Sequence, residues 1–294
     1  MKSRSFFLSI FFVSCMATGG IFVKISDLRP VATGFYRVLF SIPILYPLLK
    51  FEKGNHLSIR DKSLIFVAGM FLAGDLILWN ISFHYTTVAN ANLVANLVPF
   101  AIVPAAYFIY KEKNSKLLDG NYKEKISRNF LISLMVTLIG LVVLIEGKGD
   151  LSNGSLYGDM LAFATSIFYA IFLLIVYKVR EKASAIQVMY YSAYGSIVVL
   201  LISSLLMEGV SYPNDFEALW PLLGLAIFSQ ILGQGGLSYV LGGISVNLAA
   251  VLVLMQPVIS AILSYFIFYE TLTAQEMFGI FIVLTGIFLV KKEG

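Results

Sequence analysis

Long apolar segments constrain this chain more than any other feature. Ten segments of roughly 20 residues carry few charged side chains and are joined by short polar connections. A helix of that length can cross the hydrocarbon layer of a bilayer while pairing its own backbone groups. The segments are 5–26, 30–50, 62–83, 87–110, 128–146, 157–178, 184–206, 218–241, 246–269 and 274–291. The sequence therefore predicts an all-α polytopic membrane protein with ten transmembrane helices.

Composition agrees with lipid exposure. Apolar residues make up 59% of the chain and charged residues 13%, whereas soluble domains average roughly 45–50% and 25%. Such an excess of apolar side chains cannot be enclosed in one protein core. The one cysteine, Cys15, lies in the first apolar segment, so neither an intrachain disulfide nor a cysteine metal site can form.

Basic residues are distributed unevenly between the two sides of the predicted bundle. Most Lys and Arg residues fall in connections that share a side with the N-terminus, above all in 111–127. The positive-inside rule then places both termini in the cytoplasm of a multi-pass protein of the cell (inner) membrane. Short basic clusters between spans indicate topology and not nucleic-acid binding. The expected partners are the lipid bilayer and a small-molecule substrate; a monomer is expected, and a homodimer is left open.

An internal repeat appears at an offset of 158 residues. The segment from Val88 through Pro99 to Glu112 aligns with the segment from Val246 through Pro257 to Glu270. Five spans per half is an odd number, so the second repeat must be inverted relative to the first. We expect a first repeat at 1–146 and a second at 147–294. Inverted repeats place a substrate site near the middle of the membrane, between halves that rock to give alternating access.

Several residues occur in the order typical of one known family. They are Lys24, Pro30 and Arg37; Trp79, Tyr85, Thr86, Thr87, Val88, Ala89 and Asn90; Pro99 with Glu112; Gly158 with Asp159; and Pro257 with Glu270. In this respect the chain resembles the drug/metabolite transporter superfamily, specifically transporters with two EamA-type five-helix repeats. The resemblance covers nearly the whole chain and implies a carrier of small metabolites.

Polar residues inside the predicted spans are candidates for a substrate site, because they are costly in lipid. Arg37 and Asp75 lie at matching depths below the outer boundary, so they are expected either to form an ion pair or to hold substrate between them. A static pair that only joins two helices is the alternative. The candidate substrate-binding residues are Arg37, Asp75, Trp79, Asn80, Asn92, Asn96, Gln230, Gln234 and Gln256. Gln230 and Gln256 are expected to face the asparagines of the first half.

Other residues are candidates for structural or gating roles. Pro99 and Pro257 permit kinks, while Glu112 and Glu270 close apolar runs and could act in gating or be simply solvated. Tyr36, Tyr169, Tyr190 and Tyr191 either line the lumen or serve as interfacial anchors. The fifth and tenth spans contain almost nothing polar, and Gly140 and Gly286 would let them approach closely. Thr273 with Glu276 fits a capping box at the start of the tenth span.

An amide-rich cavity of this kind suits a zwitterionic or neutral polar molecule. A phosphorylated ligand would need several lumenal Lys or Arg residues, and only Arg37 is deep enough. The leading hypothesis is a secondary transporter of small polar organic metabolites, with an amino acid or related zwitterion as substrate. A membrane channel, or a carrier of a nucleotide- or sugar-type metabolite, remains the alternative. We expect no catalytic residues, metal site or cofactor, since neither a nucleophile with its base nor a ligand cluster is apparent.

Overall fold

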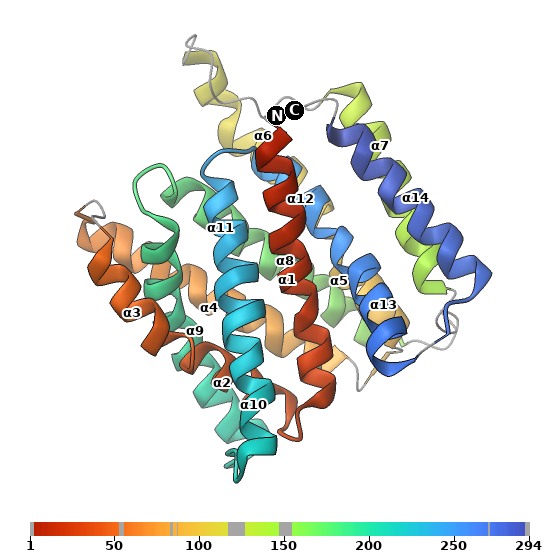
Figure 1. The fold of residues 1–294 in the computed structure, drawn as a ribbon. Coiled ribbons are helices and arrows are strands. Elements are labelled where there is room, and N and C mark those ends of the chain that lie inside the picture. Colours follow the sequence, from red (N-terminus) through yellow and green to blue (C-terminus); the bar gives the residue numbers. More distant parts are fainter. Residues whose placement is uncertain are drawn as a thin grey trace.

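A computed structural model describes residues 3–52, 56–82, 85–86, 88–116, 127–146, 155–269 and 271–291. These residues form helices and no strand. Eight helical segments are long and apolar enough to cross a membrane, and two shorter apolar helices cover 93–108 and 274–289. The helices stand side by side, and α1 begins at the end of the bundle where α14 ends (Figure 1). The predicted fold class, an all-α polytopic membrane protein, is confirmed.

Six of the predicted spans are continuous helices. They are α1 (Ser3–Ile25), α4 (Ile59–Ser82), α7 (Arg128–Glu146), α8 (Leu156–Val179), α9 (Ala185–Met207) and α14 (Ala274–Lys291). The other four are interrupted. They consist of α2 (Pro30–Leu39) with α3 (Ile42–Phe51); α5 (Val88–Ala95) with α6 (Val98–Lys116); α10 (Phe216–Gly224), the π-helix η2 (Leu225–Gln234) and α11 (Gly235–Leu241); and α12 (Val246–Val253) with α13 (Met255–Phe268).

Prolines account for three of these interruptions. Pro43, Pro99 and Pro257 each lie in the first turn after a break. Proline removes a backbone donor and disfavours helical geometry in the residue before it, so helix pairing fails just upstream.

The interrupted helices α5 and α12 occupy equivalent places in the sequence. They have 8 residues each, and both their first and their last residues are offset by 158 positions. The segment α5–α6 runs toward the end where α1 begins, whereas α12–α13 runs away from it (Figure 1). The two segments therefore have the same interruption and opposite directions.

Backbone contact joins α4 to α9 in the middle of the bundle. A Cβ atom at Gly69 would lie 1.8 Å from the carbonyl oxygen of Ser192, and one at Gly195 would lie 1.9 Å from that of Phe66. Ser196 adds a hydrogen bond from its hydroxyl to the Gly69 carbonyl, at 2.7 Å. Only glycine permits this approach, because any side chain would fill the space between the two backbones.

Helices α7 and α14 pack mainly against each other at the edge of the bundle (Figure 1). A Cβ at Gly140 would meet the backbone nitrogen of Val283 at 2.5 Å, and one at Gly286 would meet the Thr137 hydroxyl at 2.2 Å. Close mutual packing of the fifth and tenth spans is thus confirmed. The capping box is also present, since Thr273 N–H donates to the Glu276 carboxylate at 2.7 Å and Glu276 N–H donates to the Thr273 hydroxyl at 3.1 Å.

Helix α2 is attached to α9 and not to its neighbour in sequence. Although the connection between α1 and α2 is short, α1 packs mainly on η2 and α13. The carboxylate of Glu208, at the end of α9, accepts hydrogen bonds from the backbone N–H groups of Val31 at 2.9 Å and Ala32 at 2.8 Å. These are donors that the first turn of a helix cannot pair internally. A distant residue therefore caps α2.

Candidate functional site

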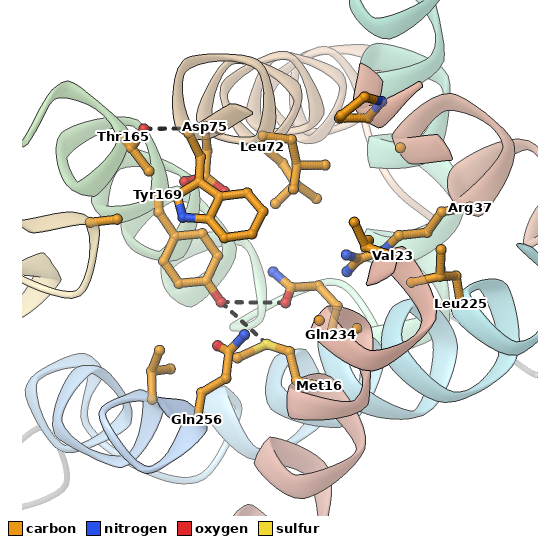
Figure 2. A pocket seen from close by; sticks show the side chains of 18 of the residues that line it. Met16, Val23, Arg37, Leu72, Asp75, Thr165, Tyr169, Leu225, Gln234 and Gln256 are labelled. Carbon is orange, nitrogen blue, oxygen red and sulfur yellow. Dashed lines mark hydrogen bonds between the residues drawn. The ribbon is translucent and has the colours of Figure 1, made fainter. Parts of the chain in front are cut away.

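A cavity of about 180 Å³ lies within the bundle and is lined from both halves of the chain (Figure 2). Its walls come from α1, α2, α4, α8, η2 and the two breaks that separate α5 from α6 and α12 from α13. The polar lining residues are Thr33, Arg37, Asp75, Trp79, Asn96, Thr165, Tyr169, Gln234 and Gln256.

One face of α2 contributes to this lining. Pro30, Thr33, Gly34 and Arg37 all border the cavity, and their spacing is that of residues stacked on one side of an α-helix. The cap from Glu208 holds the start of this helix. Arg37 consequently lies about 10 Å below the start of α2, at 1.5 Å per residue.

Arg37 and Asp75 lie on different sides of the cavity (Figure 2). Arg37 donates a hydrogen bond from Nε to the side-chain oxygen of Gln230, at 2.9 Å. The two charged side chains, both described, interact electrostatically but make no direct ion pair. A direct ion pair, and with it the static pair, is therefore not formed in this structure, and the expectation that substrate lies between the two residues stays a prediction.

The cavity is open at one end and closed at the other. Gly20 and Pro30, near the end of the bundle at which α2 begins, are exposed. Met16, Tyr169 and Gln234, deeper in the bundle, are buried. The Tyr169 hydroxyl can donate to the side-chain oxygen of Gln234 at 3.3 Å or to the sulfur of Met16 at 3.7 Å. These three residues, which we call the floor, join α8, η2 and α1 beneath the cavity (Figure 2).

Both breaks that follow the eight-residue helices border the cavity. Ala95, Asn96 and Val98 come from the first break, and Val253 and Gln256 come from the second. The helices α6 and α13 therefore begin at the cavity wall.

The structure brings most of the predicted site residues together. Arg37, Asp75, Trp79, Asn96, Gln234 and Gln256 line the cavity. Gln230 is not among the lining residues, and its side-chain oxygen accepts the hydrogen bond from Arg37. The side chains of Asn80, Asn92 and Glu112, and the whole of Glu270, fall outside the described part of the chain. Pro99 and Pro257 lie next to the two breaks.

Sequence reasoning missed two polar lining residues. Thr33 lies one helical turn before Arg37, so its spacing could have identified it. Thr165 carried no comparable signal. Among the four tyrosines considered, Tyr169 lines the cavity, whereas Tyr190 bonds to Tyr194 in an exposed pair and Tyr36 donates to the carbonyl of Ser211. The described residues contain no group of three or more His, Cys, Asp or Glu side chains that could hold a metal ion.

Comparison with known proteins places this chain among membrane transporters. It is similar to a "probable amino-acid metabolite efflux pump" of Salmonella typhimurium, with 27% identity over 57% of this chain and 59% of the relative. An S-adenosylmethionine uptake transporter of Rickettsia felis is 25% identical over 90% of this chain and 84% of the relative. A protein of known crystal structure shares the fold, with a TM-score of 0.80 and 16% identity, over 100% of this chain and 98% of the other. The EamA-like transporter family matches residues 4–118 and 156–291. This chain therefore belongs to the EamA-like transporter family.

Proposed function

We propose that this protein is a secondary carrier that moves an amino acid or a related zwitterion across the cell membrane by alternating access. The observation that carries the proposal is the separation of Arg37 and Asp75 across one cavity without a direct ion pair. A guanidinium presents a fork of donors that matches a carboxylate. The Asp75 carboxylate is the complementary partner for an ammonium group. A ligand that carries both groups would satisfy both residues at once.

The size and the lining of the cavity support a small polar ligand. Its volume of about 180 Å³ is below the roughly 300–1,000 Å³ of sites that enclose drug-sized ligands. Amide and hydroxyl groups from Asn96, Gln234, Gln256, Thr33 and Thr165 can bind the polar parts of a substrate. The names of two relatives point to related chemistry, because S-adenosylmethionine also contains an α-amino acid group.

The alternatives receive less support from the same cavity. Its described lining contains one Arg and no Lys, whereas a phosphorylated sugar or nucleotide calls for several cations. A channel would need a continuous path, and the floor residues Met16, Tyr169 and Gln234 interrupt it. We further propose a monomer with cytoplasmic termini, so that the open end of the cavity faces outward.

Counterflow in proteoliposomes tests this proposal. Vesicles loaded with leucine should accumulate labelled leucine, whereas loading with leucinamide, which lacks the carboxylate, or with 4-methylpentanoate, which lacks the ammonium, should drive little exchange. Arg37→Gln and Asp75→Asn should each reduce exchange by tenfold or more, since each removes one charged hydrogen-bonding partner worth about 1.5–3 kcal/mol. Non-saturable flux, or equal exchange by the three compounds, would contradict the proposal.

A further inference from the structure

A row of buried polar side chains runs from beside Arg37, past the floor, toward the closed end of the bundle. Gln230, Gln234 and Ser238 follow one another at four-residue intervals along η2 and α11, so they lie along one side of this segment. All three are at least nine-tenths buried. Each has a side-chain atom without a hydrogen-bond partner: Nε2 in Gln230, Nε2 in Gln234 and Oγ in Ser238.

Asn247 adds two more such atoms at the far end of this row. It is 4% exposed, and both Nδ2 and Oδ1 of its amide lack a partner. Asn247 lies in the first turn of α12, Ser238 lies in the last turn of α11, and these two helices are in contact. The two residues are thus at similar distances from the closed end of the bundle.

The buried side-chain atoms without a hydrogen-bond partner are confined to a few of the described residues. In the described part of the chain, every buried side-chain nitrogen or oxygen without a partner belongs to Gln230, Gln234, Ser238 or Asn247. Folded proteins rarely leave such groups unpaired, because burying them without a partner costs free energy. Unpaired groups that gather along one route, and not at random in the core, indicate that another conformation satisfies them.

We infer that Gln234, Ser238 and Asn247 line the second half of the translocation path. This half is closed in this structure and becomes accessible to water when the carrier opens toward the other side. The inference rests on the proposed carrier function and adds the residues of the second opening. On this view the floor separates the open cavity from the closed path, because the Tyr169 hydroxyl links Gln234 to the neighbourhood of Met16.

Arg180 closes the path at its far end. From the end of α8, its guanidinium donates to the carbonyl of Ser238 at 2.9 Å and to that of Tyr239 at 3.4 Å. It also donates to the carbonyl of Ala183. Carbonyl groups in the last turn of a helix form the negative end of its dipole and attract a cation. Arg180 therefore ties the ends of α8 and α11 together directly beside Ser238.

Thiol labelling tests the inference without any substrate. Ser238→Cys and Asn247→Cys, made in a Cys15→Ala background, report access to the path, and Ala249→Cys is the matched control because Ala249 is fully buried in the apolar core of the same helix. Each is treated with a membrane-impermeant charged maleimide in vesicles that expose the closed end. Tyr169→Phe removes the hydroxyl of the floor and keeps its ring, and Arg180→Gln removes the second closure.

The labelling rate should rise at positions 238 and 247 and should not rise at the control position 249. Tyr169→Phe and Arg180→Gln should each raise the labelling rate at 238 and 247 by roughly threefold or more, because at least one hydrogen bond of the closed state is lost, and should leave the rate at 249 unchanged. The inference is overturned if neither variant raises the rates in protein that elutes as folded, or if 249 rises in parallel. Leucine counterflow on the same preparations separates the two proposals. Failed labelling with intact counterflow rejects the path alone, and successful labelling without zwitterion counterflow rejects the substrate alone.

Discussion

Gln230 supports the one cation among the described cavity residues. Its side-chain oxygen accepts from Arg37 Nε at 2.9 Å, and Gln230 itself is 1% exposed. A hydrogen bond to a charged group contributes about 1.5–3 kcal/mol, and its loss would also leave the guanidinium free to turn away from the ligand. We predict that Gln230→Leu weakens zwitterion binding by at least about tenfold, measured by titration calorimetry in detergent. Gln275→Leu, at an exposed glutamine of α14, is the control; equal affinities in the two variants would contradict the prediction.

The sequence predicted which residues reach the cavity better than how they pair there. Arg37 and Asp75 were placed at matching depths by counting residues from helix ends, and both line the cavity. The partner of Arg37 could not be predicted in this way, because Gln230 lies 193 positions away and its direction depends on how η2 packs on α2. Depth is a local property of one helix, whereas pairing depends on the packing of two.

At the scale of helices, the contact between α4 and α9 leaves no room for a side chain. We predict that Gly69→Ala lowers the melting temperature of the detergent-solubilised protein or prevents its accumulation, because the new methyl group would overlap the Ser192 carbonyl. Overpacking of this kind typically costs about 1–3 kcal/mol or more. Gly20→Ala is the matched control, since its Cβ would meet nothing within 4 Å. A melting temperature for Gly69→Ala equal to that of the control would be incompatible with this packing.

The cap on α2 also permits a prediction. Glu208→Gln replaces one acceptor oxygen with a donor that faces the backbone N–H groups of Val31 and Ala32. Loss of a helix cap costs about 0.5–2 kcal/mol, so thermal stability should fall measurably. Glu217→Gln, in the first turn of α10, removes the same charge and leaves the cap on α2 in place. Greater destabilisation by Glu217→Gln than by Glu208→Gln would show that the cap is unimportant.

Helix interruptions were only partly predictable. Pro99 and Pro257 were expected to permit kinks, and a break occurs next to each of them. The π-helix η2 contains no proline. It packs against α1, where Gly233 lies against Met16. Such contacts are absent from the sequence of η2 itself, so its irregular geometry carried no local signal.

For the whole molecule, the arrangement of basic residues predicts which end faces the cytoplasm. A fluorescent reporter fused after Gly294 should be active, and a periplasmic phosphatase fused at the same place should be inactive, because positively charged connections stay inside. The phosphatase inserted after Asp27, in the connection between α1 and α2, should be active. The opposite pattern would reverse the sidedness of the cavity while leaving its geometry unchanged.

The hydrogen bonds to Glu208 hold the start of α2 in place, so that a movement of α9 would tilt this short helix. Its starting end is fixed to α9, a helix of the other half of the chain, while its far end is separated from α3 by the break at 40–41. The Arg37 Cα lies about 9 Å along the axis from the capped residues, so a tilt of about 15° would swing it by roughly 2 Å. A displacement of that size is enough to break the bond to Gln230. Under the proposed alternating access, a modest rotation of α9 would thus be transmitted through the ten residues of α2 to the Arg37 guanidinium.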